Sequence, residues 1–239
     1  MTSRVTEPMQ LSVIVPVLNE ASGIGELIAH LTPLQAAGAQ LILVDGGSRD
    51  TTPSQVQAAG LTLIRAPRGR ARQMNAGAAA ATGELLLFLH ADTRLPADAL
   101  AQLTEALKQG ARWGRFDVCI AGRSAWLALI AAMMNLRSRL TGIATGDQAI
   151  FVHRDLFSAL GGYAPIPLME DVELTTRLRQ ASQPACLRTR VTTSGRRWEK
   201  HGIARTVLLM WSLRLRYFFG ADPAQLALAY GYPPVADDV

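Results

Sequence analysis

The segment that most constrains the fold is an apolar run at residues 84–89, which ends directly in His90 and, two residues later, Asp92. Gly83 precedes the run and Pro96 lies beyond it, a pattern typical of a parallel strand that is covered on both faces. In open α/β sheets, ligands bind outside the carboxyl ends of such strands. The run therefore predicts a buried strand whose end carries a carboxylate well placed to hold a hard metal ion.

Shorter apolar runs alternate with helical segments before this strand. Asn19 and Ser22 are candidate caps of the first helix, and Pro33 is expected to kink or end it. The alternation predicts an α/β fold with a doubly wound, mostly parallel sheet flanked by helices. The expected strands cover residues 11–17, 41–44 and 61–64. Three helices are expected between and after them: one that carries Leu27, Ile28 and Leu31, one that starts near residues 50–53, and one at about 70–81.

The pattern changes after Asp92. The 239 residues contain no internal repeat and no low-complexity linker, so we expect one domain with one sizeable core. The expected elements of this second part are helices at 97–109, 170–180 and 203–219, strands at 113–120 and 148–152, and an apolar segment at 125–140.

Composition limits the partners and the compartment. The net charge of +5 comes mostly from arginine, which suits contacts with phosphate, although a solvated basic surface would have the same composition. No nucleic-acid partner is expected. Cys119 and Cys186 lack metal-type spacing and are expected to be reduced thiols. The first ten residues lack the apolar core of a signal peptide, and no uncharged run reaches the roughly 20 residues that span a bilayer. These features predict a cytoplasmic protein.

Missing motifs exclude three common functions of doubly wound folds. No G-x-G-x-x-G follows the first strand, so the dinucleotide fingerprint is absent. The chain also has no G-x-x-x-x-G-K-[S/T] phosphate loop and no G-x-S-x-G elbow of the hydrolase type.

What remains is a set of carboxylates at strand and helix ends. Asp45 ends the second strand, Asp92 follows the strand at 84–89, and Glu170 and Asp171 open a later helix. Each alone is explained as a cap or a turn former, and Asp50 in particular is expected to be a cap rather than a ligand. Together they indicate a functional site.

Five motifs in register resemble the inverting glycosyltransferases of family 2, which have the GT-A fold. The motifs lie at 13–20 (VIVPVLNE), 44–51 (VDGGSRDT), 72–77 (RQMNAG), 88–92 (FLHAD) and 169–174 (MEDVEL). The runs VDGGS, LHAD and TSGRRW further resemble a short bacterial subgroup labelled for arsenosugar biosynthesis. The resemblance implies a single GT-A domain over 1–239, with a nucleotide-sugar half at about 11–95, an acceptor half at about 96–200, and a C-terminal apolar helix and tail at about 201–239.

The resemblance assigns the donor site. Asp45 matches the acceptor of hydrogen bonds from the nucleobase, and the arginines near residue 72 would supply positive charge to the diphosphate. Arg68 and Arg70 lie close to that position, and a solvated helix face is the alternative explanation for all three arginines. The residues implied in nucleotide-sugar binding are Pro16, Asn19, Glu20, Asp45, Arg72, Asn75 and Arg197.

The resemblance also implies a divalent metal, Mn²⁺ or Mg²⁺, that bridges the two phosphates. Asp92 matches the last acid of the family's D-x-D motif, whereas His90 replaces the first acid and Thr93 replaces an acid often found next. Imidazole suits Mn²⁺ better than Mg²⁺. We therefore name Asp92 and His90 as candidate ligands and leave open whether His90 contacts the metal.

On the acceptor side, Asp171 matches the base that removes a proton from the acceptor hydroxyl, and Glu170 beside it would raise its pKa. Two acids that stabilise a helix N-terminus are the alternative. Glu170 and Trp198 are the implied acceptor contacts. Arg197 and Trp198 end a partial Q-x-x-R-W motif in which Ser194 replaces the glutamine, which favours transfer of a single sugar over processive synthesis.

The acceptor is expected to be small or lipid-linked. Segments 203–219 and 125–136 are apolar with scattered arginines, which fits a peripheral membrane contact, a homodimer contact or packing on the domain itself. Two other functions are kept as alternatives: a catalytically weak nucleotide-sugar binding module and a nucleotidyltransferase.

Overall fold

The computed structural model describes residues 9–232, and within this range the strands form one sheet in the order β3-β2-β1-β4-β7-β6-β8-β5. The strands are β1 (Leu11–Val17), β2 (Gln40–Asp45), β3 (Thr62–Arg65), β4 (Leu85–Phe88), β5 (Thr93–Arg94), β6 (Trp113–Ala121), β7 (Phe151–His153) and β8 (Ala185–Ser194).

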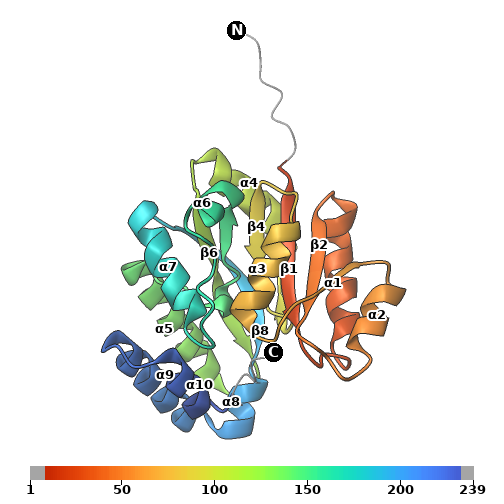
Figure 1. The fold of residues 1–239 in the computed structure, drawn as a ribbon. Coiled ribbons are helices and arrows are strands. Elements are labelled where there is room, and N and C mark those ends of the chain that lie inside the picture. Colours follow the sequence, from red (N-terminus) through yellow and green to blue (C-terminus); the bar gives the residue numbers. More distant parts are fainter. Residues whose placement is uncertain (1–8, 233–239) are drawn as a thin grey trace.

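Helices cover both faces of this sheet. In Figure 1, α3 crosses in front of the central strands, α1 and α2 lie on the right, and α9 and α10 lie at the lower left. The helices are α1 (Ile24–Ala36), α2 (Thr52–Ala58), α3 (Arg70–Ala80), α4 (Ala99–Lys108), α5 (Ala125–Thr141), α6 (Arg154–Ala159), α7 (Glu170–Ala181), α8 (Arg196–His201), α9 (Ile203–Phe218) and α10 (Pro223–Tyr230), with a 3-10 helix, η1 (Gly146–Gln148).

The core consists of two apolar layers, one on each face. Residues of α1, α4 and α5 pack on one face, and residues of α3, α6 and α7 pack on the other. Within β1 the side chains alternate, so Val13 and Val15 enter the first layer and Ile14 enters the second. Burial on both faces is the reason that these strands have continuous apolar sequences.

The first half of the sheet is parallel, as predicted. β1 pairs in parallel with both β2 and β4, and β2 pairs in parallel with β3. Helix α3 approaches β1 closely at Gly77, where a Cβ atom would overlap the side chain of Ile14. The carboxyl ends of β1, β2 and β4 therefore open at the same edge of the sheet.

The second half is mixed. β7 runs antiparallel to both β4 and β6, whereas β8 is parallel to β6 and antiparallel to β5. Helix α5 is fixed to β6 because the Asn135 side chain exchanges two hydrogen bonds, of 2.8 and 2.9 Å, with the backbone of Val118. This link holds α5 in a defined orientation over the sheet.

Several local expectations were wrong. Pro33 does not end α1, which continues to Ala36, because a proline in the last turn removes only one hydrogen bond while Leu27 and Leu31 stay buried. The residue before α1 is Gly23 rather than Asn19 or Ser22, and a glycine has no side chain that could cap the helix. The expected strand at 148–152 begins only at Phe151, because residues 146–148 form η1.

Candidate functional site

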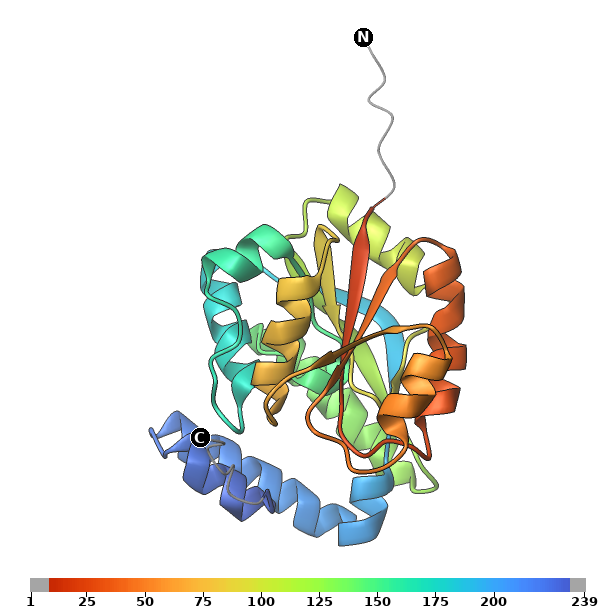
Figure 2. The same cartoon turned by 45° about the vertical axis from the view of Figure 1, so that its right-hand side comes forward.

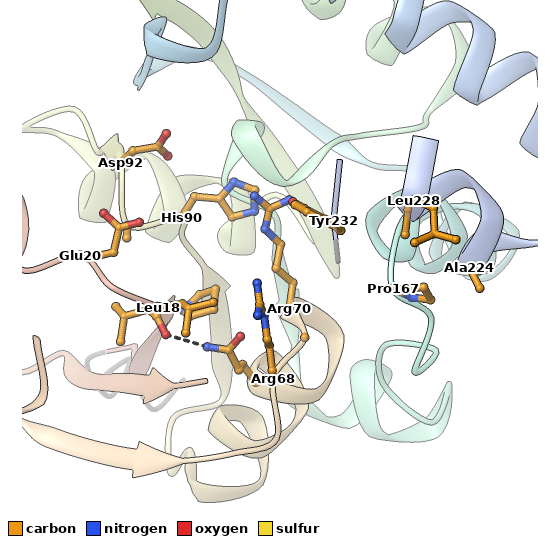
Figure 3. A pocket seen from close by; sticks show the side chains of 16 residues that line it. Leu18, Glu20, Arg68, Arg70, His90, Asp92, Pro167, Ala224, Leu228 and Tyr232 are labelled. Atoms are coloured by element: carbon orange, nitrogen blue, oxygen red, sulfur yellow. Dashed lines mark hydrogen bonds between the residues drawn. The ribbon is translucent and has the colours of Figure 1, made fainter. Parts of the chain in front are cut away.

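A cavity of about 500 Å³ lies at the carboxyl ends of β1 and β4. The ends of the two strands and the start of α3 form one wall, and α10 with the loop before α7 forms the other (Figure 3). A second hollow, of about 370 Å³, lies beside it at the ends of β2 and β3. Both open at the sheet edge where the sequence placed the ligand.

Two carboxylates share the polar end of the main cavity. Glu20 and Asp92 lie near one another on the same side of the cavity, and Arg68 and Arg70 enter it from the start of α3 (Figure 3). Burial raises the pKa of Glu20, and the negative charge of Asp92 raises it further. Such a pair gains from a bound cation, which would relieve the repulsion.

The loop after β1 is joined to the loop after β2 by hydrogen bonds. The backbone N–H of Asn19 donates to Ser48 Oγ (2.9 Å), and the Asn19 side chain accepts from the N–H of Arg49 (2.8 Å). Glu20 N–H donates to Thr52 Oγ1 at 2.8 Å. Asn19 adopts a left-handed φ of 53°, which an asparagine tolerates better than most residues. The two loops therefore form one edge of the site.

Asp45 and Asp50 serve this edge in different ways. Asp45 is buried, accepts a hydrogen bond of 3.0 Å from the N–H of Ser48, and lines the second hollow beside Arg65. Asp50 precedes Thr51, the N-cap residue of α2, and accepts hydrogen bonds from the backbone N–H groups of Thr52 (2.9 Å) and Ala21 (3.0 Å). Hydrogen bonding to Thr52, first through its side chain, lowers the pKa of Asp50.

Helix α3 contributes a residue that the sequence pattern did not single out. Gln73 is buried, lines the cavity and donates to the carbonyls of Val17 (3.0 Å; dashed line in Figure 3) and Val44 (2.7 Å). Its neighbour Arg72 is exposed and does not line the cavity. A single polar residue at the inner face of a helix is the signal that could have identified Gln73.

Asn75 lies outside the cavity and holds the loop before α7. Its side-chain amide donates to the carbonyl of Tyr163 (2.8 Å) and accepts from the N–H of the same residue (2.9 Å). Both polar ends of Asn75 are therefore engaged by the backbone.

His90 lines the cavity, and its ring contacts η1. Its Nδ1 lies 3.2 Å from Oδ1 of Asp147, and a Cβ atom on Gly146 would overlap its Nε2. Partial desolvation opposes ionisation of Asp147, whose side chain is 45% exposed, but the His90 hydrogen bond and the positive charges of Arg70 and Arg197 outweigh it and lower the pKa of Asp147. Both ring nitrogens of His90 thus face η1.

The same 3-10 helix contacts the acid pair at the start of α7. Oδ2 of Asp171 accepts a hydrogen bond of 2.8 Å from the N–H of Gly146. Glu170 is only 5% exposed, and burial followed by the charge of Asp171 raises its pKa to about 7. The repulsion within the pair therefore acts on Glu170, the more buried member. A chain of contacts runs from His90 through η1 to Asp171.

Helix α10, which the sequence did not predict, covers the cavity. Arg197 donates to the carbonyl of Tyr230 (3.0 Å), and its guanidinium lies 3.6 Å from the centre of the Tyr230 ring. Arg70 lies 5.9 Å from the centre of the Tyr232 ring. Partial desolvation lowers the pKa of Arg70, whose side chain is still exposed, but the nearby tyrosines and acids outweigh it and raise the pKa overall. Trp198 instead packs against the first core layer.

Residues 12–158, more than half of the chain, match the family model described as glycosyl transferase family 2. The chain belongs to glycosyltransferase family 2. Its resemblance to this family is therefore confirmed, and the solved structures described below share the predicted GT-A fold. The match ends before Glu170, so the acid pair and α10 lie outside it.

Curated relatives of this family 2 member include undecaprenyl-phosphate 4-deoxy-4-formamido-L-arabinose transferases. The protein from Pseudomonas aeruginosa (strain LESB58) is 30% identical over 154 residues, which cover 57% of this chain and 44% of the relative. The protein from Sodalis glossinidius is 30% identical over 163 residues, which cover 59% and 48%. The chain therefore spans less than half the length of these relatives.

Solved structures share the fold at lower identity. A mannosyltransferase from Pyrobaculum calidifontis in complex with GDP-Man and Mn²⁺ has a TM-score of 0.63 at 21% identity, covering 95% of this chain and 70% of that one. Glucosyl-3-phosphoglycerate synthase from Mycobacterium tuberculosis, in complex with Mn²⁺, UDP and glucosyl-3-phosphoglycerate, has a TM-score of 0.59 at 21% identity, covering 77% and 71%.

Proposed function

We propose that this glycosyltransferase moves a single sugar from a nucleotide-diphosphate sugar to a small or lipid-linked acceptor, with inversion and with the assistance of a divalent metal. The observation that carries the proposal is the cavity at the ends of β1 and β4, where Glu20 and Asp92 lie near Arg68 and Arg70. Opposite charges in one cavity suit a diphosphate together with its cation.

The donor would extend across both hollows. The nucleobase fits the smaller one, where Asp45 ends β2, and Asn19 sits on the edge between them. The diphosphate would lie beside Arg68 and Arg70, since these line the main cavity and Arg72 does not. Arg197 is near enough to lower the pKa of Asp147 and could reach the same phosphates once it leaves Tyr230.

Asp92 and Glu20 would hold the metal. Within residues 9–232, no group of three or more His, Cys, Asp or Glu side chains is arranged to bind a metal ion. A Mg²⁺-type site typically uses one or two carboxylates and takes its remaining ligands from substrate phosphates and water, so this pair fits it. A bound metal would stabilise charge on the departing diphosphate. His90, whose nitrogens face η1, would position η1 rather than ligate the metal.

Asp171 would act as the base. The acceptor oxygen attacks the anomeric carbon, its proton passes to the Asp171 carboxylate, and the bond from that carbon to the diphosphate oxygen breaks. In-line attack inverts the anomeric centre. The hydrogen bond from Gly146 fixes the orientation of the Asp171 carboxylate. Glu170, buried behind it, would shape the acceptor side rather than take the proton.

The far wall of the cavity favours an acceptor with an apolar part. Pro167 and three residues of α10 line it, namely Ala224, Ala227 and Leu228. The curated relatives are named as undecaprenyl-phosphate transferases, and undecaprenyl phosphate is a lipid phosphate. Both observations support the lipid-linked alternative within the proposal.

A thermal-shift screen with UDP-, GDP- and dTDP-sugars tests donor binding. We expect one nucleotide family to raise the Tm in the presence of Mn²⁺, because a ligand that binds the folded state stabilises it. Stabilisation by a nucleoside triphosphate alone would favour a nucleotidyltransferase. Donor binding with no turnover for any acceptor would favour a nucleotide-sugar binding module.

A further inference from the structure

The exposed apolar side chains of this protein are concentrated on three helices. Within the described residues, every exposed large apolar side chain lies on α5, on α9 or the residue after it, or on α10. They are Trp126, Leu129, Met133, Leu136 and Leu140 on α5, Leu208, Trp211, Leu215, Phe218 and Phe219 at α9, and Leu228 on α10. Scattered exposed apolar residues are normal, but a contiguous group indicates an interaction surface.

On α5 and α9 these side chains form continuous stripes. Within each helix, up to Leu140 on α5 and Phe218 on α9, successive members are separated by three or four residues, so each set projects from one side of its helix. The opposite side of each helix is buried: Leu127 and Ala131 of α5 pack in the first core layer, and Leu213 of α9 packs against α10. Both stripes therefore point away from the protein.

The two helices start from a shared anchor. The backbone N–H of Arg123, just before α5, donates to Glu199 of α8 at 3.0 Å. Trp198 and Ile203, at the junction of α8 and α9, pack against the core layer that contains Leu127. Figures 1 and 2 both show α5 and α9 at the lower end of the molecule. The stripes thus belong to the same region of the surface.

The charges on these helices have one sign. α5 carries two arginines and α9 carries three, and neither helix contains an aspartate or glutamate. On α9, Arg205 and Arg216 are exposed on one side of the apolar stripe, and Arg214 lies on the other by helical spacing. A helix of this type lies in the plane of a membrane interface, with its apolar face inserted and its arginines at the headgroups.

We propose that the stripes of α5 and α9 form a docking surface for an anionic phospholipid bilayer. No helix among residues 9–232 is long and apolar enough to cross a membrane, so the contact would be peripheral. A second copy of the chain fits less well, because a symmetric pair of α9 helices would bring exposed arginines together with no acid on that helix to neutralise them. On α5, Arg139 is already paired with Asp117 of β6. Anionic headgroups supply the missing negative charge.

The surface also connects to the active site. Leu228 is 54% exposed and lines the main cavity, and α10 packs directly on α9. An acceptor held in a bilayer would therefore approach the cavity beside α10. This connection rests on the proposed function, whereas docking itself rests only on the helices.

Vesicle sedimentation tests docking without substrate. The full chain is mixed with vesicles of phosphatidylcholine alone or of phosphatidylcholine with phosphatidylglycerol. We expect binding to the anionic vesicles, a loss of at least roughly tenfold in Trp211→Gln/Phe218→Gln, and a similar loss in Arg205→Gln/Arg216→Gln. The control Lys108→Gln/Arg112→Gln removes two charges beside α4 and α6 and should bind like the wild type.

The outcomes separate docking from its alternatives. All changed residues on α9 are exposed, and circular dichroism with donor-induced thermal shifts would verify that each variant is folded. No binding of the wild type to anionic vesicles, or equal binding by the Trp211→Gln/Phe218→Gln variant, would overturn the proposal. A dimer in light scattering that this variant dissociates would assign the surface to a second copy instead. Loss of docking with intact donor binding leaves the proposed function standing.

Discussion

The two walls of the cavity are built differently. The donor wall comes from strand ends and loops that are joined by backbone hydrogen bonds, such as Asn19 to Ser48 and Glu20 to Thr52. The acceptor wall comes from α10 and the loop before α7. The helices on this side of the molecule meet through individual contacts, such as Gly146 to Asp171 and Arg197 to Tyr230. The match to the glycosyltransferase family 2 model covers the donor wall and stops before α7.

This difference suggests how one fold can serve many acceptors. Under the proposed function, a fixed donor wall would keep the nucleotide and the metal in place, while a wall made of separate helices can change with few consequences for the sheet. The comparison predicts that changes on one wall alter donor binding and that changes on the other alter transfer.

The largest effect is expected from Asp171→Asn. Transfer should fall at least roughly 100-fold, because an amide cannot accept the proton, while donor affinity stays near the wild-type value. Rates and thermal shifts with donor measure the two quantities. Asp155→Asn is the matched control, because Asp155 makes the same bond to the next N–H at the start of α6. Unchanged transfer in Asp171→Asn would remove the base assignment.

On the donor wall, Asp92→Ala should weaken metal-dependent donor binding by roughly tenfold or more, because Glu20 alone would have to hold the cation. Calorimetric titration of the nucleoside diphosphate with and without Mn²⁺ measures this. Asp98→Ala, at the exposed start of α4, serves as the control. Equal Mn²⁺-dependent binding by Asp92→Ala and the wild type would contradict the placement of the metal.

A smaller effect is expected in the pH dependence of stability. The pKa of Glu170 is raised from 4.5 to about 7, so folding favours its neutral form. Below about pH 4 the Glu170 carboxyl is neutral in the folded and the unfolded state, and its contribution to the free energy of unfolding is fully present. This contribution is lost as the pH rises from there through about 7. Glu170→Gln cannot ionise, so its Tm relative to the wild type should rise by a few degrees, roughly 2–4 °C or more, between about pH 5 and 8. A difference that stays flat over this pH range would show that Glu170 ionises without cost.

The smallest effect is expected from Asn75→Ala. Loss of its two bonds to Tyr163 should reduce the free energy of unfolding by about 1–3 kcal/mol, measured by urea denaturation, with donor affinity unchanged. If Asn75→Ala kept full stability but lost donor affinity, Asn75 would instead be a nucleotide-binding residue, as its motif implies.

The sequence predicted the donor wall well because its signals are local. Two-sided burial makes β1, β2 and β4 continuous apolar runs, and the polar residues that follow each run fall at one edge of a parallel sheet. Glu20, Asp45 and Asp92 could therefore be placed at that edge without a structure.

The acceptor wall was harder to predict because it depends on contacts between distant segments. η1 contacts both His90 and Asp171, and the contacting residues are 57 and 25 residues apart in the sequence, respectively. No local sequence pattern encodes contacts over such separations. β8 has an irregular burial pattern, and α10 is short with a weak apolar periodicity, so neither was expected. Arg70, rather than Arg72, lines the cavity because α3 begins at residue 70 and its first turn faces the strand ends.

The most direct test of the account is the identity of the nucleotide released from the donor. The protein is incubated with UDP-, GDP- and dTDP-sugars and Mn²⁺, and the products are separated by chromatography. We predict release of a nucleoside diphosphate from one of these donors and its loss in Asp92→Ala. Release of pyrophosphate from a nucleoside triphosphate, with no nucleoside diphosphate from any sugar donor, would contradict the assignment of the cavity to sugar transfer.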